Sequence, residues 1–415
     1  ELLWPFSIPP SSLKDDDVEI AYYGKSNLAR FKSLYRNGLS KRYGKIMQTI
    51  SGMHFNYSLP EEFWRSNFSV GNPEKTYRNI LYFRTLRNIK RNNWIILFLF
   101  GCSPTIGQNL TEKSTNNFEY LNKADLFLPY ATSLRMSDIG YKNAGQINLN
   151  ISYDNLEGYS ETLRKATQTP SKVFSKFSDR TKGLDQISGN LLQIEDEYYA
   201  VCRPKSNGRK HIRPTSMLKE GGIDYIELRS LDINPFSNIG IDAHTISFLE
   251  VFFIYNCLSE CGYLSSKCTE ELQRNDLEVS KNGRSKFTKL LKNNSAISLY
   301  DEGSRILEGM SEISQVLGHD ESFLEYFKSM LRDSSKTLSG SFALKVFEEN
   351  IEIEEFGYSL SRTYKKNFRK LNPKTQGITK VIQSEVTRSI EEEKRIQKEI
   401  QIPFDEYLEE YYVSG

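Results

Sequence analysis

The sequence has few cysteines, no long apolar run and no excess of charge of either sign. Five cysteines in 415 residues fall far below the density of a disulfide-stapled secreted protein and favour a reducing compartment. The longest apolar run, residues 94–100, is too short to span a bilayer, so we expect a soluble, cytoplasmic protein without a membrane partner. A net charge of +2 gives the protein no overall positive electrostatic field that would attract nucleic acid. Any anion must therefore be bound by a local cluster of cationic side chains.

The chain is long enough to bury a substantial core, and its pattern changes near residue 240. Before that point, alternating and helical patterns are mixed. After it, apolar residues recur at helical spacing over residues 245–264, 286–299, 304–317, 321–331 and 342–350. We therefore expect a sheet-containing region over residues 1–240 and a mainly helical region over 241–415 packed on it. A charged, solvated helix is predicted over 381–399, with residues 403–408 folding back.

Residues 221–237 give the clearest strand pattern. Successive side chains of a strand point to opposite faces, so Ile226 and Leu228 share one face while Glu227 and Arg229 share the other. The two charged residues are close enough to bind one ligand together. The segment alone leaves a second interpretation open, in which an exposed sheet carries a solvated ion pair.

Residues 47–60 predict a second strand with a polar, small-residue face. His54 lies in the middle of that face, and the neighbouring Gly52 leaves room for a ligand to approach closely. The histidine is either a ligand or an ordinary exposed side chain. A helix is predicted over residues 24–42 with Asn27 as its N-cap, and it places Tyr35 and Leu39 one turn apart on one face. That face is either core or the wall of a pocket.

Three further segments carry cations. In the predicted loop over residues 128–141, Arg135 either binds a carboxylate or pairs with Asp138. The strand predicted over residues 191–205 ends in Arg203 and a basic cluster that suits either a phosphate or a flexible surface loop, and we favour the surface loop beyond Arg203. The helix predicted over residues 73–94 carries basic residues among aromatic ones, which favours a solvated face over an RNA-binding surface.

Four blocks, residues 47–60, 128–141, 193–205 and 221–237, stand in an order that resembles the proteobacterial glutamate–cysteine ligases, also called γ-glutamylcysteine synthetases. The similarity includes residues 31–36 and 403–408 and so covers nearly the whole chain. It implies an α+β fold in which a curved antiparallel sheet, similar to that of glutamine synthetase, forms a cleft surrounded by helices. It also implies the ATP-dependent joining of glutamate to cysteine through a γ-glutamyl phosphate, the first step of glutathione biosynthesis.

The resemblance assigns roles residue by residue. The metal ion would be Mg²⁺, and the partners would be small molecules only: glutamate, cysteine and ATP, bound by a monomer that takes no nucleic acid. The implied site residues are Glu227 and His54 for the metal, Arg229 and Arg203 for the transferred phosphate, Arg135 for glutamate, and Tyr35, Leu39, Gln48, Tyr141 and Tyr199 for cysteine.

One departure from the family follows from the same comparison of motifs. In the family, most metal-binding carboxylates and part of the glutamate site belong to a segment upstream of the point that matches residue 1. The resemblance therefore implies a ligase without its N-terminal segment, whose metal site and activity are weakened. An alternative function remains open, that of a truncated, non-catalytic relative which keeps Arg135, Arg203 and Arg229 as a nucleotide- or anion-binding pocket.

Overall fold

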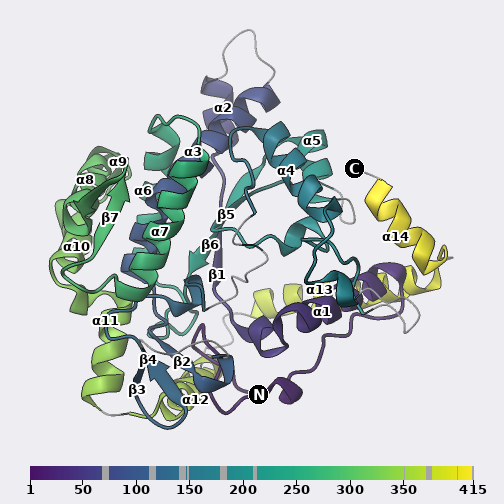
Figure 1. The fold of residues 1–415 in the computed structure, drawn as a ribbon, viewed down its shortest axis with the longest axis horizontal. Helices are drawn as coiled ribbons and strands as arrows, with labels where there is room; N and C mark the ends of the chain where they lie inside the picture. The colour runs from purple at the N-terminus through teal and green to yellow at the C-terminus, as the bar shows by residue number, and fades with distance from the viewer. Residues whose placement is uncertain are drawn as a thin grey trace.

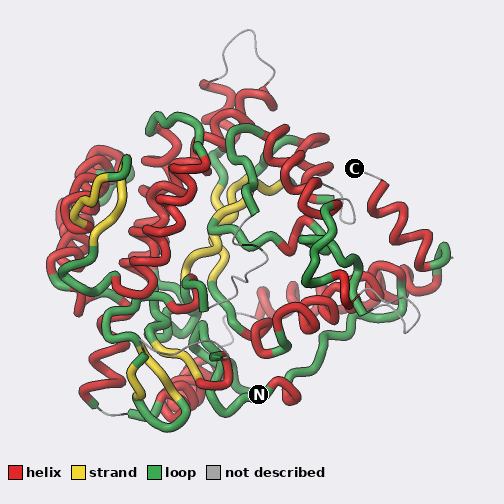
Figure 2. Tube along the Cα trace, viewed as in Figure 1, coloured by secondary structure: helices red, strands yellow, loops and turns green. Residues whose placement is uncertain are grey.

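The computed structural model describes residues 1–67, 74–111, 118–139, 146, 149–177, 185–208, 213–349, 351–370, 376–399 and 401–413. Helices predominate and the strands are short (Figures 1 and 2). The helices are α1 (Asn27–Tyr43), α2 (Glu61–Asn67), α3 (Glu74–Phe100), α4 (Leu156–Gln168), α5 (Pro214–Gly221), α6 (Ala243–Leu258), α7 (Ser266–Asn282), α8 (Leu299–Gly309), α9 (Ser311–Val316), α10 (Glu321–Arg332), α11 (Leu338–Ala343), α12 (Ile353–Lys370), α13 (Gln376–Lys398) and α14 (Phe404–Val413). The strands are β1 (Met53–Tyr57), β2 (Thr105–Gly107), β3 (Glu119–Tyr120), β4 (Asp125–Phe127), β5 (Cys202–Lys205), β6 (Tyr225–Leu231), β7 (Lys289–Lys292) and β8 (Ser295–Ser298).

The central sheet is antiparallel, in the order β1-β6-β5, and lies in the middle of the molecule (Figure 2). Strand β6 confirms the strand predicted in residues 221–237, and its apolar face is core because Ile226 and Leu228 are buried. Phe55 and Tyr57 of β1 pack their rings against Phe253 of α6 on that side. One face of the sheet is thus fixed by packing, and the face that carries Glu227 is left for polar groups.

Helix α3 is longer and more deeply buried than predicted. The sequence suggests a helix over 73–94 followed by a separate apolar segment, but one helix continues to Phe100 because no glycine or proline interrupts it before Gly101. Its basic residues do not form a solvated face. Arg78 pairs with Glu61 and Glu74, while Arg87 is buried and donates to backbone carbonyls at residues 153 and 154. The α3 cations are therefore largely engaged within the protein.

The helical region contains one hairpin where a helix was predicted. Residues 286–299 form strands β7 and β8, which pair antiparallel. The two residues between them, Asn293 and Asn294, have φ of 52° and 61°, the conformation of a tight hairpin turn that asparagine tolerates. The tendency of these two asparagines to form a tight turn outweighs the helical spacing of the apolar residues around them. Helices α6, α8 and α10 confirm most of the remaining predicted pattern.

The strand predicted over 191–205 is reduced to β5, because residues 195–197 form a 3-10 turn instead. This turn places two buried carboxylates within reach of hydrogen-bond donors. Glu195 accepts hydrogen bonds from Thr215, and Glu197 accepts one from the backbone N–H of Gln193. The surface loop predicted beyond Arg203 is wrong at Arg213, which is buried and donates to two backbone carbonyls of α14. Residues 209–212 lie outside the described residues.

Helix α1 runs below the central strands in Figure 1. Its N-cap is Ser26, whose side chain accepts from the backbone N–H of Ala29, rather than the predicted Asn27. The predicted return of the chain end is confirmed by α14, where Leu408 packs with Phe31 of α1 in a small core cluster. The predicted solvated helix is α13, on whose described residues no side chain is buried.

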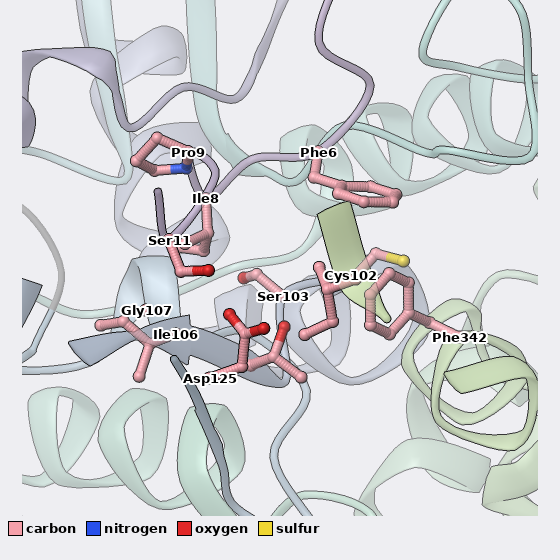
Figure 3. Close-up of a pocket in the computed structure, with 12 residues that line it drawn as sticks. Phe6, Ile8, Pro9, Ser11, Cys102, Ser103, Ile106, Gly107, Asp125 and Phe342 are labelled. Atoms are coloured by element: carbon pink, nitrogen blue, oxygen red, sulfur yellow. The ribbon is translucent and has the colours of Figure 1, made fainter. Parts of the chain in front are cut away.

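The N-terminal segment packs beneath the sheet β2-β4-β3. There, Phe6 and Ile8 approach Ser103 and Asp125 around a void of about 10 Å³ (Figure 3). That volume is about the room that one water molecule needs, so this void is not a candidate for a substrate site. Among the described residues, no helix is long and apolar enough to cross a membrane.

Candidate active site

A cleft of about 380 Å³ lies over the polar face of the central sheet, between that sheet, α1 and the loop that contains Arg135. Eight of the ten predicted site residues line it. They are Tyr35, Leu39, Gln48, His54, Arg135, Tyr199, Arg203 and Arg229. Glu227 adjoins the cleft through its contacts with His54 and Arg229, and Tyr141 lies outside the described residues. Segments distant in the sequence thus meet at one place.

Glu227 lies on the middle strand of the sheet and contacts two cations. In the register, Asn56 of β1 and Arg203 of β5 lie opposite it. Its Oε2 accepts a hydrogen bond from a terminal nitrogen of Arg229 at 2.8 Å and lies 3.8 Å from Nζ of Lys205. Burial raises the pKa of Glu227, but these two cations outweigh burial and hold the pKa below its usual value. The carboxylate is therefore ionised at neutral pH.

The other oxygen of Glu227, Oε1, lies 3.7 Å from Nδ1 of His54. Burial lowers the pKa of His54, and the charge of Arg229 lowers it further against the opposing effect of Glu227. A neutral imidazole and an ionised carboxylate are the forms that bind a metal ion. Two donors of one Mg²⁺ ion lie within about 4 Å of each other, so the observed separation fits such a pair.

The donor set is small for a metal site built by protein alone. Across the part of the chain that the structure describes, no group of three or more His, Cys, Asp or Glu side chains could hold a metal ion. Magnesium commonly takes one or two carboxylates and completes its shell with substrate phosphates and water. Glu227 and His54 therefore fit a metal that arrives with a nucleotide rather than a closed protein cage.

Arg203, which is buried, and Arg229, which is half-buried, bring positive charge to the cleft. Burial lowers the pKa of Arg229, and the neighbouring charge of Arg203 lowers it further. Arg203 lies on β5, within the predicted strand, and donates to the backbone carbonyls of Asp196 and Tyr198. The Nε atoms of both arginines are buried, and no atom among the described residues accepts a hydrogen bond from either. Two neighbouring guanidinium groups, each with an unused Nε donor, are suited to binding an anion.

Arg135 lies in the single 3-10 turn Leu134–Met136 and is buried. Its partner is Asp232, at 2.6 Å from Nε, and not Asp138, which instead pairs with Lys281. The local pairing considered from the sequence is therefore wrong. The guanidinium also contacts the hydroxyl of Tyr199 at 3.2 Å, at the edge of the cleft.

Comparisons with known proteins show the family of the chain. The profile of the glutamate–cysteine ligase family matches residues 1–279. The chain belongs to the glutamate–cysteine ligase family. Among the family's members, the enzyme of Pseudoalteromonas translucida is 32% identical over 426 residues, which cover 99% of this chain and 81% of that protein. The enzyme of Erwinia tasmaniensis is 38% identical over 385 residues, which cover 89% of this chain and 73% of that protein.

Solved structures place the fold in the same family. The glutamate–cysteine ligase of Francisella tularensis, solved in complex with AMP, has a TM-score of 0.90 at 29% identity and covers 100% of this chain and 82% of its own. A bifunctional glutathione synthetase from Pasteurella multocida shares the fold, with a TM-score of 0.64 at 21% identity over 88% of this chain and 41% of its own. The predicted family, the α+β fold and the prediction of a ligase enzyme are thus confirmed.

The sequence analysis missed several residues that line this ligase's cleft. They are Arg36, Ile50, Ser51, Asp196, Glu197, Tyr198 and Lys205. A signal existed for Lys205, because it lies two residues after Arg203 and shares its face of the strand. Arg36 directly follows the predicted Tyr35 on α1. Ile50 and Ser51 lie between a 3-10 turn and β1, in the part of the predicted strand 47–60 that does not form a strand.

Proposed function

We propose that this chain joins the γ-carboxylate of glutamate to the amine of cysteine at the expense of ATP, the first step of glutathione biosynthesis. The observation that carries the proposal is the cleft itself, in which an ionised carboxylate, a neutral imidazole and buried guanidinium groups converge over one sheet. An oxygen of the glutamate γ-carboxylate attacks the γ-phosphorus of ATP, and ADP leaves. The cysteine amine then attacks the acyl phosphate, the amide bond forms, and phosphate and a proton are released.

The cations of β5 and β6 are the groups that we assign to the phosphates. Negative charge develops on the equatorial oxygens of the transferred phosphoryl group, and fixed donors stabilise it because they need no reorganisation. The Nε donors of Arg203 and Arg229 suit this role, and Lys205 adds a third positive charge nearby. Glu227 and His54 would hold Mg²⁺, which supplies further charge stabilisation when it is bound.

Arg135 is the group that we assign to a carboxylate of glutamate, because it lies at the cleft edge beside the hydroxyl of Tyr199. The cysteine side is assigned to α1. Leu39 is 1% exposed and lines the cleft with Tyr35 and Gln48. A small apolar pocket of this kind selects by size, and one methylene group changes binding only modestly. Tyr141 is assigned to the same pocket by resemblance alone.

We also propose, as the resemblance to the family implies, that the chain works as a monomer without a partner macromolecule. One hydrophobic core cluster includes side chains of both the 1–240 and the 241–415 regions, for example Leu228 and Phe252, which supports the packing of the helical region on the catalytic one. The five cysteines are free, which supports a location in the cytoplasm.

One experiment separates this function from the alternative of a non-catalytic binding relative. The purified chain is incubated with ATP and Mg²⁺, and ADP release is measured with glutamate alone, with cysteine alone and with both. The proposed ligase releases ADP in quantity only when both amino acids are present, and γ-glutamylcysteine accumulates in equal amount. Calorimetric binding of ATP and glutamate without turnover would support the alternative instead.

A further inference from the structure

We propose that Asp232 is a positioning residue, which fixes the edge of Arg135 that meets the carboxylate of glutamate. The inference rests on the proposed function of the cleft. Asp232 directly follows the last residue of β6 and is buried, and its carboxylate does not line the cleft. Any effect that it has on substrate must therefore pass through Arg135.

The carboxylate of Asp232 is held by three donors. Oδ1 accepts from Nε of Arg135 at 2.6 Å. Oδ2 accepts from the backbone N–H of Cys102 and from the hydroxyl of Ser103, each at 2.7 Å. Cys102 and Ser103 come directly after the end of α3, so the carboxylate ties the longest helix to the arginine. Charge-assisted bonds of this length are among the stronger ones in proteins and hold their partners in a narrow range of positions.

These contacts leave one end of the Arg135 guanidinium for a ligand. The Nε edge is occupied by Asp232, and one terminal nitrogen, Nη2, donates to the carbonyl of Leu231 at 2.8 Å. The other terminal nitrogen, Nη1, has only longer contacts, at 3.2 Å to the hydroxyl of Tyr199 and 3.4 Å to the carbonyl of Arg229. Arg135 thus offers its Nη1 end, beside the Tyr199 hydroxyl, rather than the fork of Nε and Nη2 that often binds carboxylates.

On another side, the backbone at Gly52 lies close to the guanidinium of Arg135. A Cβ atom at this position would stand 2.6 Å from Cζ of Arg135 and 2.8 Å from its Nη1, and also 2.6 Å from the backbone oxygen of Leu231. The φ angle of Gly52 is not in the left-handed region, so close approach rather than backbone conformation accounts for the glycine. Asp232 and the backbone at Gly52 thus restrict the guanidinium of Arg135 from two sides.

The test compares Michaelis constants for the three substrates. In Asp232→Asn, the amide oxygen can still face Arg135, but the amide nitrogen then faces the N–H of Cys102 and the negative charge is lost. We expect KM for glutamate to rise about tenfold, with KM for ATP and cysteine and kcat changed by less than about twofold, because an interaction made in both ground and transition states is weakened. Gly52→Ala should change the glutamate constant in the same direction, and Asp138→Asn, in the same loop as Arg135, should not.

A merely structural role gives a different result. If Asp232 only supports the fold, Asp232→Asn lowers the folded fraction, so the apparent kcat and the midpoint of thermal unfolding fall. KM for glutamate then keeps its wild-type value. That result would overturn the inference. If Asp232→Asn does not fold, Ser103→Ala, which removes one of the three bonds, decides between the same outcomes.

Calorimetric titration with glutamate separates this inference from the proposed function. A wild-type chain that turns over, with variants whose glutamate affinity is unchanged, refutes the positioning role alone. A wild-type chain that binds glutamate without turnover refutes the ligase, while about tenfold weaker binding by Asp232→Asn still supports positioning. A wild-type chain that neither binds glutamate nor turns over refutes both.

Discussion

Nδ1 of His54 lies 3.7 Å from Oε1 of Glu227, across two antiparallel strands whose pairing is irregular at this point. Met53 pairs with Leu231 and Phe55 with Leu228, so β6 has one more residue than β1 between these two pairs. Such a bulge bends the strand and redirects side chains, and it is common beside active sites. The irregular pairing thus contributes to how the proposed metal ligands face each other.

Glu227→Gln should remove activity almost completely. The amide keeps the shape of the side chain but supplies no negative charge to a metal ion or to Arg229. Loss of one charge-stabilising group in a phosphoryl-transfer site commonly costs on the order of a hundredfold or more in kcat. ADP release in the presence of both amino acids measures the change, with Glu220→Gln on the exposed end of α5 as the control. Activity near that of the control would remove Glu227 from the site.

Arg229→Lys should also lower kcat, although the charge is kept. Lysine cannot contact Glu227 through one nitrogen and offer a second, fixed donor to the phosphate. We expect a loss of about tenfold to a hundredfold in kcat with little change in KM for cysteine. Arg388→Lys, on exposed helix α13, provides the matched control. A kcat equal to that of the control would mean that charge alone is needed at this position.

Leu39→Ala should widen the proposed cysteine pocket. The ratio of kcat/KM for a larger amine acceptor to that for cysteine should increase about tenfold, the usual effect of one or two methylene groups in an apolar pocket. Leu34→Ala, on the same helix but packed in the cluster of α1 and α14, is the control for a general loss of packing. An unchanged ratio in Leu39→Ala would place the acceptor elsewhere in the cleft.

Glu197→Gln should destabilise the fold strongly. Glu197 and Arg42 form an ion pair at 3.0 Å with both side chains fully buried, and Tyr43 donates a hydrogen bond to the same oxygen. Removing one member of a buried pair leaves the other charge uncompensated and costs about 3–5 kcal/mol in the free energy of unfolding. Urea denaturation measures it. Glu325→Gln, which breaks an exposed pair with Arg332, should cost less than about 1 kcal/mol.

The ionisation of Glu195 should make the free energy of unfolding depend on pH. Burial raises its pKa, although the hydrogen bonds from Thr215 oppose that effect. A raised pKa contributes stability that is fully present below the unfolded value, near pH 4.3, and that is lost as the pH rises through the folded value. The stability of the wild type relative to Glu195→Gln should therefore fall as the pH rises above about 4. Parallel curves for the two proteins would contradict this assignment.

The sequence predicted β6 well because alternation is a local property, whereas only residues 53–57 of the predicted strand 47–60 and residues 202–205 of the predicted strand 191–205 form strands. Glu227 and Arg229 share the polar face of β6, and eight predicted residues line one cleft, although their chemical roles stay predictions. The pairing of Arg135 could not be predicted, because its partner Asp232 lies 97 residues away while Asp138 is only three residues along the chain. The β7–β8 hairpin was missed because its turn depends on two asparagines with positive φ, within apolar spacing that suits a helix.

Strand β6 is paired on both sides, which makes the cleft intolerant of changes in chain length. Inserting or deleting one residue before Glu227 would exchange the two faces of the strand and bring Glu227 and Arg229 into the core, with Ile226 and Leu228 toward substrate. The turn between β7 and β8, by contrast, can lengthen without moving any cleft residue. Length variation among functional variants of this enzyme should therefore be absent from residues 225–231 and tolerated at residues 293–294.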